Sequence, residues 1–236
     1  MGDYSRAAEF YDLLYSGDKD YSGEAQLLAD LIRKHRAEAS TVLDVGCGTG
    51  AHARGLLDLG FDVDGVDIEA AFVEIARGKC PEGDFQVADM TKLDLPHRYD
   101  VVLCLFSAIG YVLTELELNK ALGHMARHLN GGGLVVVDPW FEPDKLSDRW
   151  IATLTSERDG TTVTRMSRNV IEGTISRLEF EYLIGTPEGI ERRSEVHELG
   201  LFTEAQMEAA FRQAGLRVER LPKMIRTRGI YVGSQD

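Results

Sequence analysis

Acidic residues beside a run of glycines carry the clearest chemical signal in the sequence. Residues 41–50 place Asp44 in a short apolar run and follow it with Gly46, Gly48 and Gly50. Glycine lets the backbone turn sharply and come close to a ligand, and a carboxylate beside such a turn accepts hydrogen bonds and attracts cationic groups. An apolar strand, a glycine turn and a helix in this order are typical of the nucleotide-binding corner of a doubly wound α/β sheet.

Two ligands compete for this corner. Gly46, Gly48 and Ala51 fit the G-x-G-x-x-G/A pattern of NAD-binding proteins. The carboxylate of Asp44 would repel a dinucleotide pyrophosphate, however, and it suits the ammonium or sulfonium group of S-adenosylmethionine. A glycine turn that binds nothing is the plainest alternative. We favour the methyl donor, because acidic residues also follow the next two predicted strands.

Those two acidic residues are placed to bind the nucleoside of the donor. Asp67 ends the strand predicted at 61–66, where its carboxylate can accept hydrogen bonds from both ribose hydroxyls. Asp89 and Met90 follow the strand predicted near 84–87 and can meet the adenine amino group. The expected donor-binding residues are Tyr11, Asp44, Gly46, Cys47, Gly48, Gly50, Asp67, Ile68, Asp89, Met90 and Phe106.

Composition and charge exclude several classes of partner. The 236 residues carry a formal net charge of −13, so we expect no nucleic-acid partner, which would need clustered Lys and Arg. No run of 18 apolar residues exists, so we expect no membrane span. The N-terminus lacks the pattern of a signal peptide, and the three cysteines are widely spaced. No histidine pair has metal-site spacing, so we expect no metal. The widely spaced cysteines give no sign of a disulfide framework, so the cytoplasm is the expected compartment.

The elements that position these residues alternate between strand and helix along most of the chain. This alternation predicts a Rossmann-like, seven-stranded, doubly wound α/β sheet with helices on both faces. The run Asn130-Gly-Gly-Gly133 is expected to break the chain before the fifth strand, and Thr203 is expected to cap a helix at 203–213. Strands are expected near 41–45, 61–66, 84–87, 99–105, 133–138, 216–221 and 229–233.

One segment departs from that alternation. Residues 151–200 alternate polar and apolar side chains at period two, which predicts an antiparallel β insertion of three or four strands after the fifth strand. We therefore expect a methyltransferase domain at 1–145 and 201–236 and an insertion at 146–200. The insertion would cap the pocket, pair with a second subunit to give a homodimer, or do both.

The chain resembles class I S-adenosylmethionine-dependent methyltransferases, and more closely the nucleotide-linked amino-sugar N-methyltransferases of the desosamine and mycaminose pathways. The glycine motif indicates only the larger class, whereas matches in the insertion and near the C-terminus are specific. Two departures concern Tyr111, where that family has histidine, and Asp138-Pro-Trp-Phe141, where it has Glu-Pro-Trp-Trp. The matching segments include Leu43-Asp-Val-Gly-Cys-Gly-Thr-Gly50, Phe106-Ser-Ala-Ile-Gly110, Gly160-Thr-Thr-Val-Thr-Arg165, Leu201-Phe-Thr203 and Arg228-Gly229.

The resemblance implies contacts to the acceptor. Tyr4 matches a tyrosine that the family places near the substrate, and Tyr111 stands at the family's histidine position. An unperturbed phenol, with a pKa of about 10, is a poor base at neutral pH, so we expect Tyr111 to orient the acceptor rather than deprotonate it. The alternative is that both tyrosines only line the pocket and take no part in the reaction. The expected acceptor-binding residues are Trp140, Arg165, His197 and Arg228.

Two of these acceptor-binding residues, His197 and Arg228, allow a more specific interpretation. His197 lies in the insertion, and a half-exposed strand residue without chemistry is its simpler interpretation. Arg228 lies in a basic stretch with Lys223 and Arg226, where it would contact the diphosphate of a nucleotide-linked substrate. The predicted function is S-adenosylmethionine-dependent N-methylation of a dTDP-linked deoxy amino sugar. Methylation of another small acceptor at O or N is one alternative, and a non-catalytic donor-binding module is another.

Overall fold

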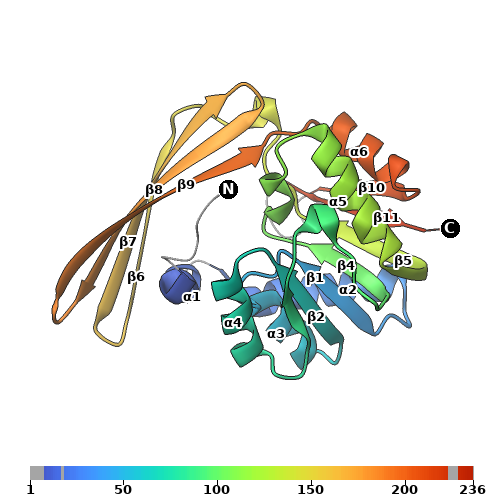
Figure 1. The fold of residues 1–236 in the computed structure, drawn as a ribbon, viewed down its shortest axis with the longest axis horizontal. Coiled ribbons are helices and arrows are strands. Elements are labelled where there is room, and N and C mark those ends of the chain that lie inside the picture. Colours follow the sequence, from blue (N-terminus) through green and yellow to red (C-terminus); the bar gives the residue numbers. More distant parts are fainter. Residues whose placement is uncertain (1–7, 17–18, 223–227, 236) are drawn as a thin grey trace.

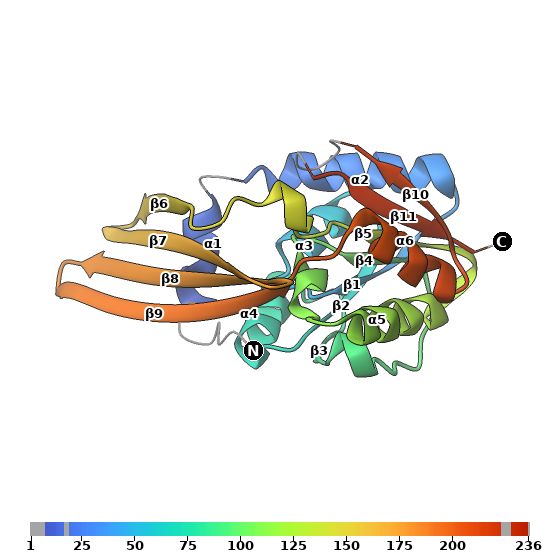
Figure 2. The ribbon, with the colours of Figure 1, turned by 90° about the horizontal axis from the view of Figure 1, so that it is seen from above.

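The computed structural model describes residues 8–16, 19–222 and 228–235. Two β-sheets lie side by side, and the larger one carries helices on both faces (Figures 1 and 2). We call them sheet A and sheet B. Tyr4, Lys223 and Arg226, singled out in the sequence, lie outside the described residues.

Sheet A confirms the predicted seven-stranded, doubly wound architecture. Its order is β10-β11-β5-β4-β1-β2-β3, and only β11 runs antiparallel to its neighbours. The strands that build the donor corner are parallel, so their carboxyl ends share one edge. The strands are β1 (Thr41–Val45), β2 (Asp62–Asp67), β3 (Phe85–Val87), β4 (Tyr99–Cys104), β5 (Leu129–Val137), β10 (Arg217–Leu221) and β11 (Ile230–Ser234).

The helices cover both faces of sheet A, as the alternation predicted. One face packs against α2 (Tyr21–His35), α3 (Ala51–Asp58) and α4 (Ala70–Lys79). The other packs against α5 (Glu115–Arg127) and α6 (Glu204–Gln213). Because both faces are covered, the central strands are mostly apolar, and every residue of β4 is buried.

Local signals explain where two of these helices begin. The Thr203 hydroxyl accepts a hydrogen bond from the Gln206 amide, and the Gln206 side chain accepts one from the Thr203 amide. This capping box confirms the predicted cap. Thr114 and Glu117 form the same motif at the start of α5.

The glycine run does not break the chain as predicted. Residues 130–133 lie inside β5, which begins at Leu129. Leu129 pairs with Tyr99 and Leu134 pairs with Val101, so the glycines bulge out between two paired positions. A glycine run thus marks a bulge within this strand rather than its beginning.

Sheet B confirms the predicted antiparallel insertion and has four strands. These are β6 (Ile151–Arg158), β7 (Thr161–Glu172), β8 (Ile175–Thr186) and β9 (Gly189–Gly200), paired in chain order. One face packs against α1 (Ala8–Ser16), whose Leu13 and Leu14 join the side chains of that face in an apolar cluster. Figure 1 shows α1 in the angle between sheet B and the helices of sheet A.

Among the residues that the structure describes, short 3₁₀ turns complete the architecture around the edge of sheet A. They are η2 (Met90–Lys92), η3 (Ala108–Tyr111) and η4 (Pro143–Lys145). Within the described part of the chain, no helix is long and apolar enough to cross a membrane.

Candidate active site

The glycine turn connects β1 to α3 and depends on left-handed backbone at three positions. Gly46, Gly48 and Gly50 have φ values of +74°, +54° and +76°, which glycine adopts without steric cost. A Cβ on Gly46 would lie 2.5 Å from the Cβ of Ala108, whereas a Cβ on Gly48 would meet nothing within 4 Å. The turn is therefore packed under η3 at Gly46 and open at Gly48.

Asp67, at the end of β2, is part of the same turn. Its Oδ2 accepts a 2.8 Å hydrogen bond from the Gly48 amide, and its Oδ1 accepts a 2.9 Å bond from the Glu69 amide. Burial raises the pKa of Asp67, and these backbone amides offset part of that rise. The next residue, Ile68, is 40% exposed at the rim. The structure thus brings together the second acidic residue and the glycines.

Asp44 lies on β1 and is only 1% exposed. Neither of its carboxylate oxygens has a hydrogen-bond partner among the residues that the structure describes. Burial, reinforced by the nearby negative charge of Asp67 and opposed by Lys19, raises the pKa of Asp44 to about 7. A buried carboxylate without a partner is costly, so this position fits a ligand that brings its own cation and donors.

Lys19 is a site residue that the sequence interpretation missed. Its ammonium lies 3.0 Å from Glu24 Oε2 and 3.7 Å from the centroid of the Phe106 ring. Its side chain is 1% exposed. A buried cation therefore stands beside the carboxylate pair of the donor corner, close to predicted residue Phe106.

The chain is strained just after β4. Phe106 and Ser107 have φ values of +51° and +67°, which non-glycine residues rarely adopt. Such strain is of order 1–3 kcal/mol per residue and is typical of functional sites. The Ser107 amide donates to the Asp138 carbonyl, which ties the end of β4 to the end of β5.

Asp89 and Met90 follow β3, as predicted. The Asp89 carboxylate caps η2 by accepting a 2.8 Å bond from the Thr91 amide. Burial raises the pKa of Asp89, but hydrogen bonds from Thr91 and the Lys92 ammonium outweigh that effect and hold it below its ordinary value. The Met90 methyl lies 4.0 Å from where a Gly46 Cβ would be. An ionised carboxylate and an apolar side chain thus flank the turn.

Helix α1 closes over this corner. The Tyr11 ring lies 4.7 Å from that of Tyr15 and 5.0 Å from that of Phe72. The Asp12 carboxylate accepts a 2.5 Å hydrogen bond from the Thr49 hydroxyl of the glycine turn. Asp12 also lies 2.7 Å from the Lys79 ammonium. Hydrogen bonds to the turn and to α4 therefore position the predicted residue Tyr11.

A second region, the acceptor cavity, lies beyond η3 and has a volume of about 340 Å³. It is lined by residues from η3, the segment after β5, η4, the β9–α6 connection and the last two strands. The lining residues are Ile109, Gly110, Pro139, Trp140, Phe141, Glu142, Lys145, Gly200, Phe202, Met207, Arg220, Arg228 and Tyr231.

Arg228 links this cavity to the strained end of β4. Its Nη2 donates a 2.9 Å hydrogen bond to the Ser107 hydroxyl and lies 3.8 Å from Asp138 Oδ2. Its guanidinium lies 5.1 Å from the Trp140 ring centroid and 4.9 Å from that of Phe141. Predicted residues Arg228 and Trp140 therefore meet in one wall of the cavity.

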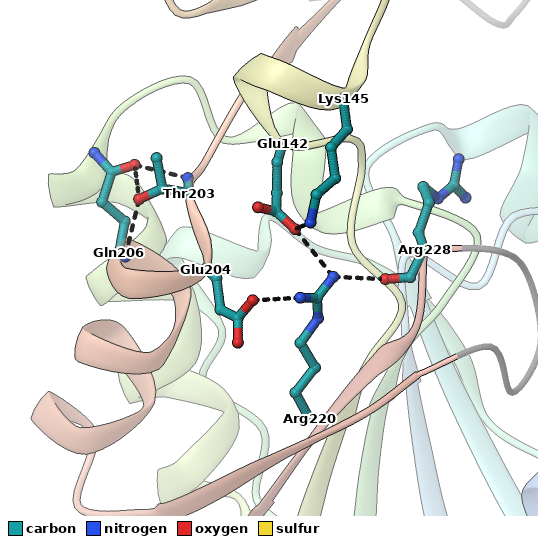
Figure 3. A network of polar contacts seen from close by, with 7 residues as sticks. All are labelled: Glu142, Lys145, Thr203, Glu204, Gln206, Arg220 and Arg228. Carbon is teal, nitrogen blue, oxygen red and sulfur yellow. Dashed lines mark hydrogen bonds and ion pairs between the residues drawn. The ribbon is translucent and has the colours of Figure 1, made fainter.

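Two more cations share the cavity with Glu142 (Figure 3). Arg220 Nη2 lies 3.0 Å from Glu142 Oε1 and 3.1 Å from the Arg228 carbonyl, and its Nη1 pairs with Glu204. Lys145 Nζ lies 2.6 Å from the same Glu142 oxygen. Three cations, Lys145, Arg220 and Arg228, are thus balanced at this cavity by three carboxylates, Glu142, Glu204 and Asp138.

His197 is not half-exposed, and that interpretation of it is wrong. Its side chain is fully buried on the inner face of sheet B, because β9 packs this face against η3. The Tyr111 hydroxyl lies 3.2 Å from His197 Nδ1, and His197 Nε2 lies 3.3 Å from Glu195 Oε2. Tyr182 donates a 3.0 Å hydrogen bond to the same Glu195 oxygen.

Arg165 lies on the same inner face, on β7. Its Nη1 donates a 2.5 Å hydrogen bond to the Tyr15 hydroxyl, and its guanidinium lies 4.5 Å from the Phe180 ring centroid. The Tyr15 ring is 5.3 Å from the Phe106 ring. Sheet B, α1 and the end of β4 are thus joined, and Arg165 lies away from the acceptor cavity, against the donor side.

Comparisons with known proteins identify the class of site. A family model described as a methyltransferase domain matches residues 42–133. The chain is 42% identical to the dTDP-3-amino-3,6-dideoxy-alpha-D-glucopyranose N,N-dimethyltransferase of Streptomyces fradiae, over 99% of this chain and 92% of that protein. The chain belongs to the sugar N-methyltransferase family. It is therefore an S-adenosylmethionine-dependent methyltransferase, which decides between the two ligands considered for the glycine turn.

Two solved structures share the fold over nearly the whole chain. DesVI of Streptomyces venezuelae is 39% identical with a TM-score of 0.93, covering 98% of both chains. CalS10 of Micromonospora echinaspora, an amino pentose methyltransferase of calicheamicin biosynthesis solved with S-adenosylmethionine bound, is 34% identical with a TM-score of 0.88, covering 96% of both chains.

Proposed function

We propose that this sugar N-methyltransferase transfers two methyl groups from S-adenosylmethionine to the amino group of a dTDP-linked deoxy amino sugar. The observation that carries the proposal is the full-length similarity to a dTDP-amino-sugar N,N-dimethyltransferase, at 42% identity. The two guanidinium groups in the wall of the acceptor cavity, those of Arg220 and Arg228, support it, because phosphate oxygens are ligands that guanidinium groups bind well.

Four positions would hold the donor. Asp44 would face its cationic amino-acid end, where the buried carboxylate has room for a partner. Asp67 would accept hydrogen bonds from the ribose hydroxyls, and Asp89 from the adenine amino group. Lys19, buried beside them, would pair with the donor carboxylate. Each contact matches a charge or donor on the ligand with its complement on the protein.

Three residues would hold the acceptor. Arg228 and Arg220 supply guanidinium groups, which bind phosphate oxygens in a bidentate manner. Trp140 offers an aromatic face at the same wall, on which a base or sugar can stack. Arg228 is already fixed by Ser107 and Asp138, so it would present a prearranged contact to the diphosphate.

The reaction is an in-line displacement. When bound, S-adenosylmethionine supplies a methyl group on a sulfonium. The acceptor nitrogen forms the new N–C bond as the C–S bond breaks, and the electron pair of that bond stays on sulfur. The protein's part is to align the groups and exclude water. Tyr111, the last residue of η3, and Trp140, which lies beside η3, would orient the sugar, and α1 with sheet B would shield the donor side.

We propose two further assignments for the insertion, residues 146–200. Its inner face, through Arg165 and His197, would close the site. Its outer face exposes Met166, Leu183 and Val196 at 53%, 52% and 41%, interspersed with charged residues such as Glu181 and Arg192, and we propose this mixed surface as a homodimer contact. Equilibrium sedimentation of the wild type and of Leu183→Glu tests the dimer, which should dissociate in the variant; a wild-type monomer at all concentrations would contradict it. The expected compartment remains the cytoplasm.

A substrate panel tests the proposed acceptor. A dTDP-linked amino sugar, the same sugar 1-phosphate without the nucleoside, and the matching dTDP sugar with a hydroxyl in place of the amine would each be incubated with labelled donor. The proposal requires turnover with the first, a much higher KM with the second and no transfer to the third. Transfer to the hydroxyl sugar would favour O-methylation, and equal KM values for the first two would reject recognition of the nucleotide.

A further inference from the structure

Each cation among the described residues that line the acceptor cavity already has a carboxylate beside it. The pairs are Lys145 with Glu142, Arg220 with Glu142 and Glu204, and Arg228 with Asp138. The positive charges of the cavity are therefore balanced before an acceptor binds. An anionic ligand that binds these cations must take the place of a carboxylate, or it will lie beside a like charge, which is unfavourable.

The three carboxylates differ in how readily a ligand could replace them. Asp138 is 1% exposed, and its amide donates to the Cys104 carbonyl between β4 and β5, so it is fixed in the core of the fold. The Glu204 side chain is 44% exposed, begins α6 and is not among the residues that line the cavity. Glu142 lies in the cavity wall itself. It is therefore the carboxylate that an entering anion would meet.

Both cations that contact Glu142 bind the same oxygen. Lys145 Nζ lies 2.6 Å from Glu142 Oε1, and Arg220 Nη2 lies 3.0 Å from that atom (Figure 3). Lysine and arginine are the side chains that proteins use to bind phosphate oxygens. The Glu142 oxygen therefore occupies the position in which one phosphate oxygen could bind both cations.

The contacts of Glu142 can be exchanged without unfolding the wall around it. Glu142 precedes η4, but its side chain makes no capping hydrogen bond to that turn. Its side chain is 21% exposed and that of Lys145 is 56% exposed. Ion pairs with this degree of exposure stabilise a protein little, so a ligand with two negative charges can displace the carboxylate toward solvent.

We propose that Glu142 is a specificity-determining residue that makes the acceptor cavity select ligands by their negative charge. The inference rests on the proposed methylation of a dTDP-linked sugar. Before the acceptor binds, Glu142 neutralises Arg220 and Lys145. The diphosphate takes over both cations, and Glu142 turns away from them. A sugar without phosphate brings no charge to replace the carboxylate, so it leaves these ion pairs in place and binds weakly.

A purely structural role for Glu142 predicts a change of the opposite sign. If Glu142 only held Arg220 and Lys145 in position, loss of its charge would loosen both cations and weaken binding of a nucleotide. If Glu142 competes with the phosphates, loss of its charge removes the competitor and strengthens that binding. The direction of the change in Kd therefore separates the two roles.

The test compares ligands that differ only in their phosphates. Thymidine, dTMP and dTDP would be titrated by calorimetry into the wild type and Glu142→Gln, which keeps the length of the side chain and an oxygen for both cations. Glu204→Gln is the matched control, because it removes a negative charge from the same guanidinium at a position that does not line the cavity. The kcat and KM for a dTDP-linked amino sugar would be measured with all three proteins.

We expect Glu142→Gln to bind dTDP about threefold to tenfold more tightly than the wild type, because two partly exposed ion pairs no longer have to be exchanged. The gain should be smaller for dTMP and absent for thymidine. The KM for the dTDP-linked amino sugar should fall by a similar factor while kcat changes little. Glu204→Gln should gain clearly less than Glu142→Gln.

Failure of the inference and failure of the proposed function give different results. Glu142→Gln that binds dTDP no more tightly than the wild type, gains equally for thymidine, or gains no more than Glu204→Gln would reject charge selection by Glu142 and leave the proposed function intact. A wild type that binds dTDP but methylates no dTDP-linked amino sugar would reject the proposed function alone. A wild type that does not bind dTDP would reject both.

Discussion

The Asp67 carboxylate and the Gly48 amide are joined by a 2.8 Å hydrogen bond. One carboxylate oxygen therefore holds the glycine turn, and the other is held by the Glu69 amide. The residue expected to bind the ribose also keeps the turn open at Gly48, where a Cβ would meet no atom within 4 Å. Donor recognition and turn geometry depend on the same side chain.

Replacement of Asp67 should weaken donor binding. Asp67→Ala removes charge-assisted hydrogen bonds worth roughly 1.5–3 kcal/mol, so the donor Kd measured by calorimetry should rise about tenfold or more. Asp62→Ala, on the exposed start of the same strand, is the control and should leave Kd unchanged. An unaltered Kd in Asp67→Ala would remove Asp67 from the donor site.

Asp44 should make donor affinity depend on pH. Burial raises the pKa of its carboxyl to about 7, so below pH 7 a cationic donor must displace a proton. Donor affinity should therefore fall as the pH is lowered from 8 to 6 in the wild type and stay flat in Asp44→Asn. A wild-type affinity that does not change over this range would contradict the pairing of Asp44 with the donor's cation.

The Asp44 carboxyl should also make protein stability depend on pH. Donor affinity should rise with pH, whereas the free energy of unfolding should fall. The folded-state pKa of about 7 lies above the unfolded value near 4, so between these values the folded protein holds a proton that the unfolded chain has lost. The free energy of unfolding therefore decreases as the pH rises through this window. Without donor, Asp44→Asn should have a higher Tm than the wild type at pH 8 and a smaller difference at pH 5. A difference that shrinks as the pH rises would contradict this sign.

Glycine substitutions should separate strain from donor contact. Gly48→Ala and Gly60→Ala both add a methyl group at positive φ, +54° and +88°, with no atom within 4 Å. Each should lower the free energy of unfolding by about 1 kcal/mol. Only Gly48→Ala should also raise the donor Kd, because its new methyl group would enter the space that the bound donor is proposed to occupy. Equal donor Kd values in the two variants would place the donor elsewhere.

Arg228 should affect the acceptor more than the donor. Arg228→Lys keeps a positive charge but loses the planar guanidinium that contacts Ser107 and faces the cavity. Acceptor KM should rise about tenfold, equivalent to roughly 1.4 kcal/mol, while the donor Kd stays constant. Arg212→Ala, on the exposed side of α6, is the control. An unchanged KM would reject the diphosphate contact.

The sequence predicted what depends on local pattern. Buried apolar strands followed by acidic residues placed Asp44, Asp67 and Asp89 at one edge of the sheet, because the carboxyl ends of parallel strands meet there. Period-two alternation located sheet B, and the Thr203 capping motif located the start of α6. Each of these signals lies within about ten residues of chain, where propensity and spacing act directly.

Local sequence patterns did not predict the features that depend on contacts between distant segments of the chain. His197 was interpreted as half-exposed because one strand does not reveal which of its faces is covered, and its burial depends on β9 packing against η3. The contact of Lys19 with the Phe106 ring, and those of Asp12 with Thr49 and Lys79, join segments far apart in the chain. The bulge in β5 depends on the register with β4. No local pattern carries this information.

The most direct test of the account is the position and number of the transferred methyl groups. The wild-type protein would be incubated with S-adenosylmethionine carrying a ¹³C-methyl group and a dTDP-linked deoxy amino sugar, and the product followed by NMR. The account predicts two equivalent labelled methyl groups, both bonded to the amino nitrogen of the sugar. A labelled methyl group on a sugar oxygen, or no transfer by a folded protein that binds the donor, would contradict it.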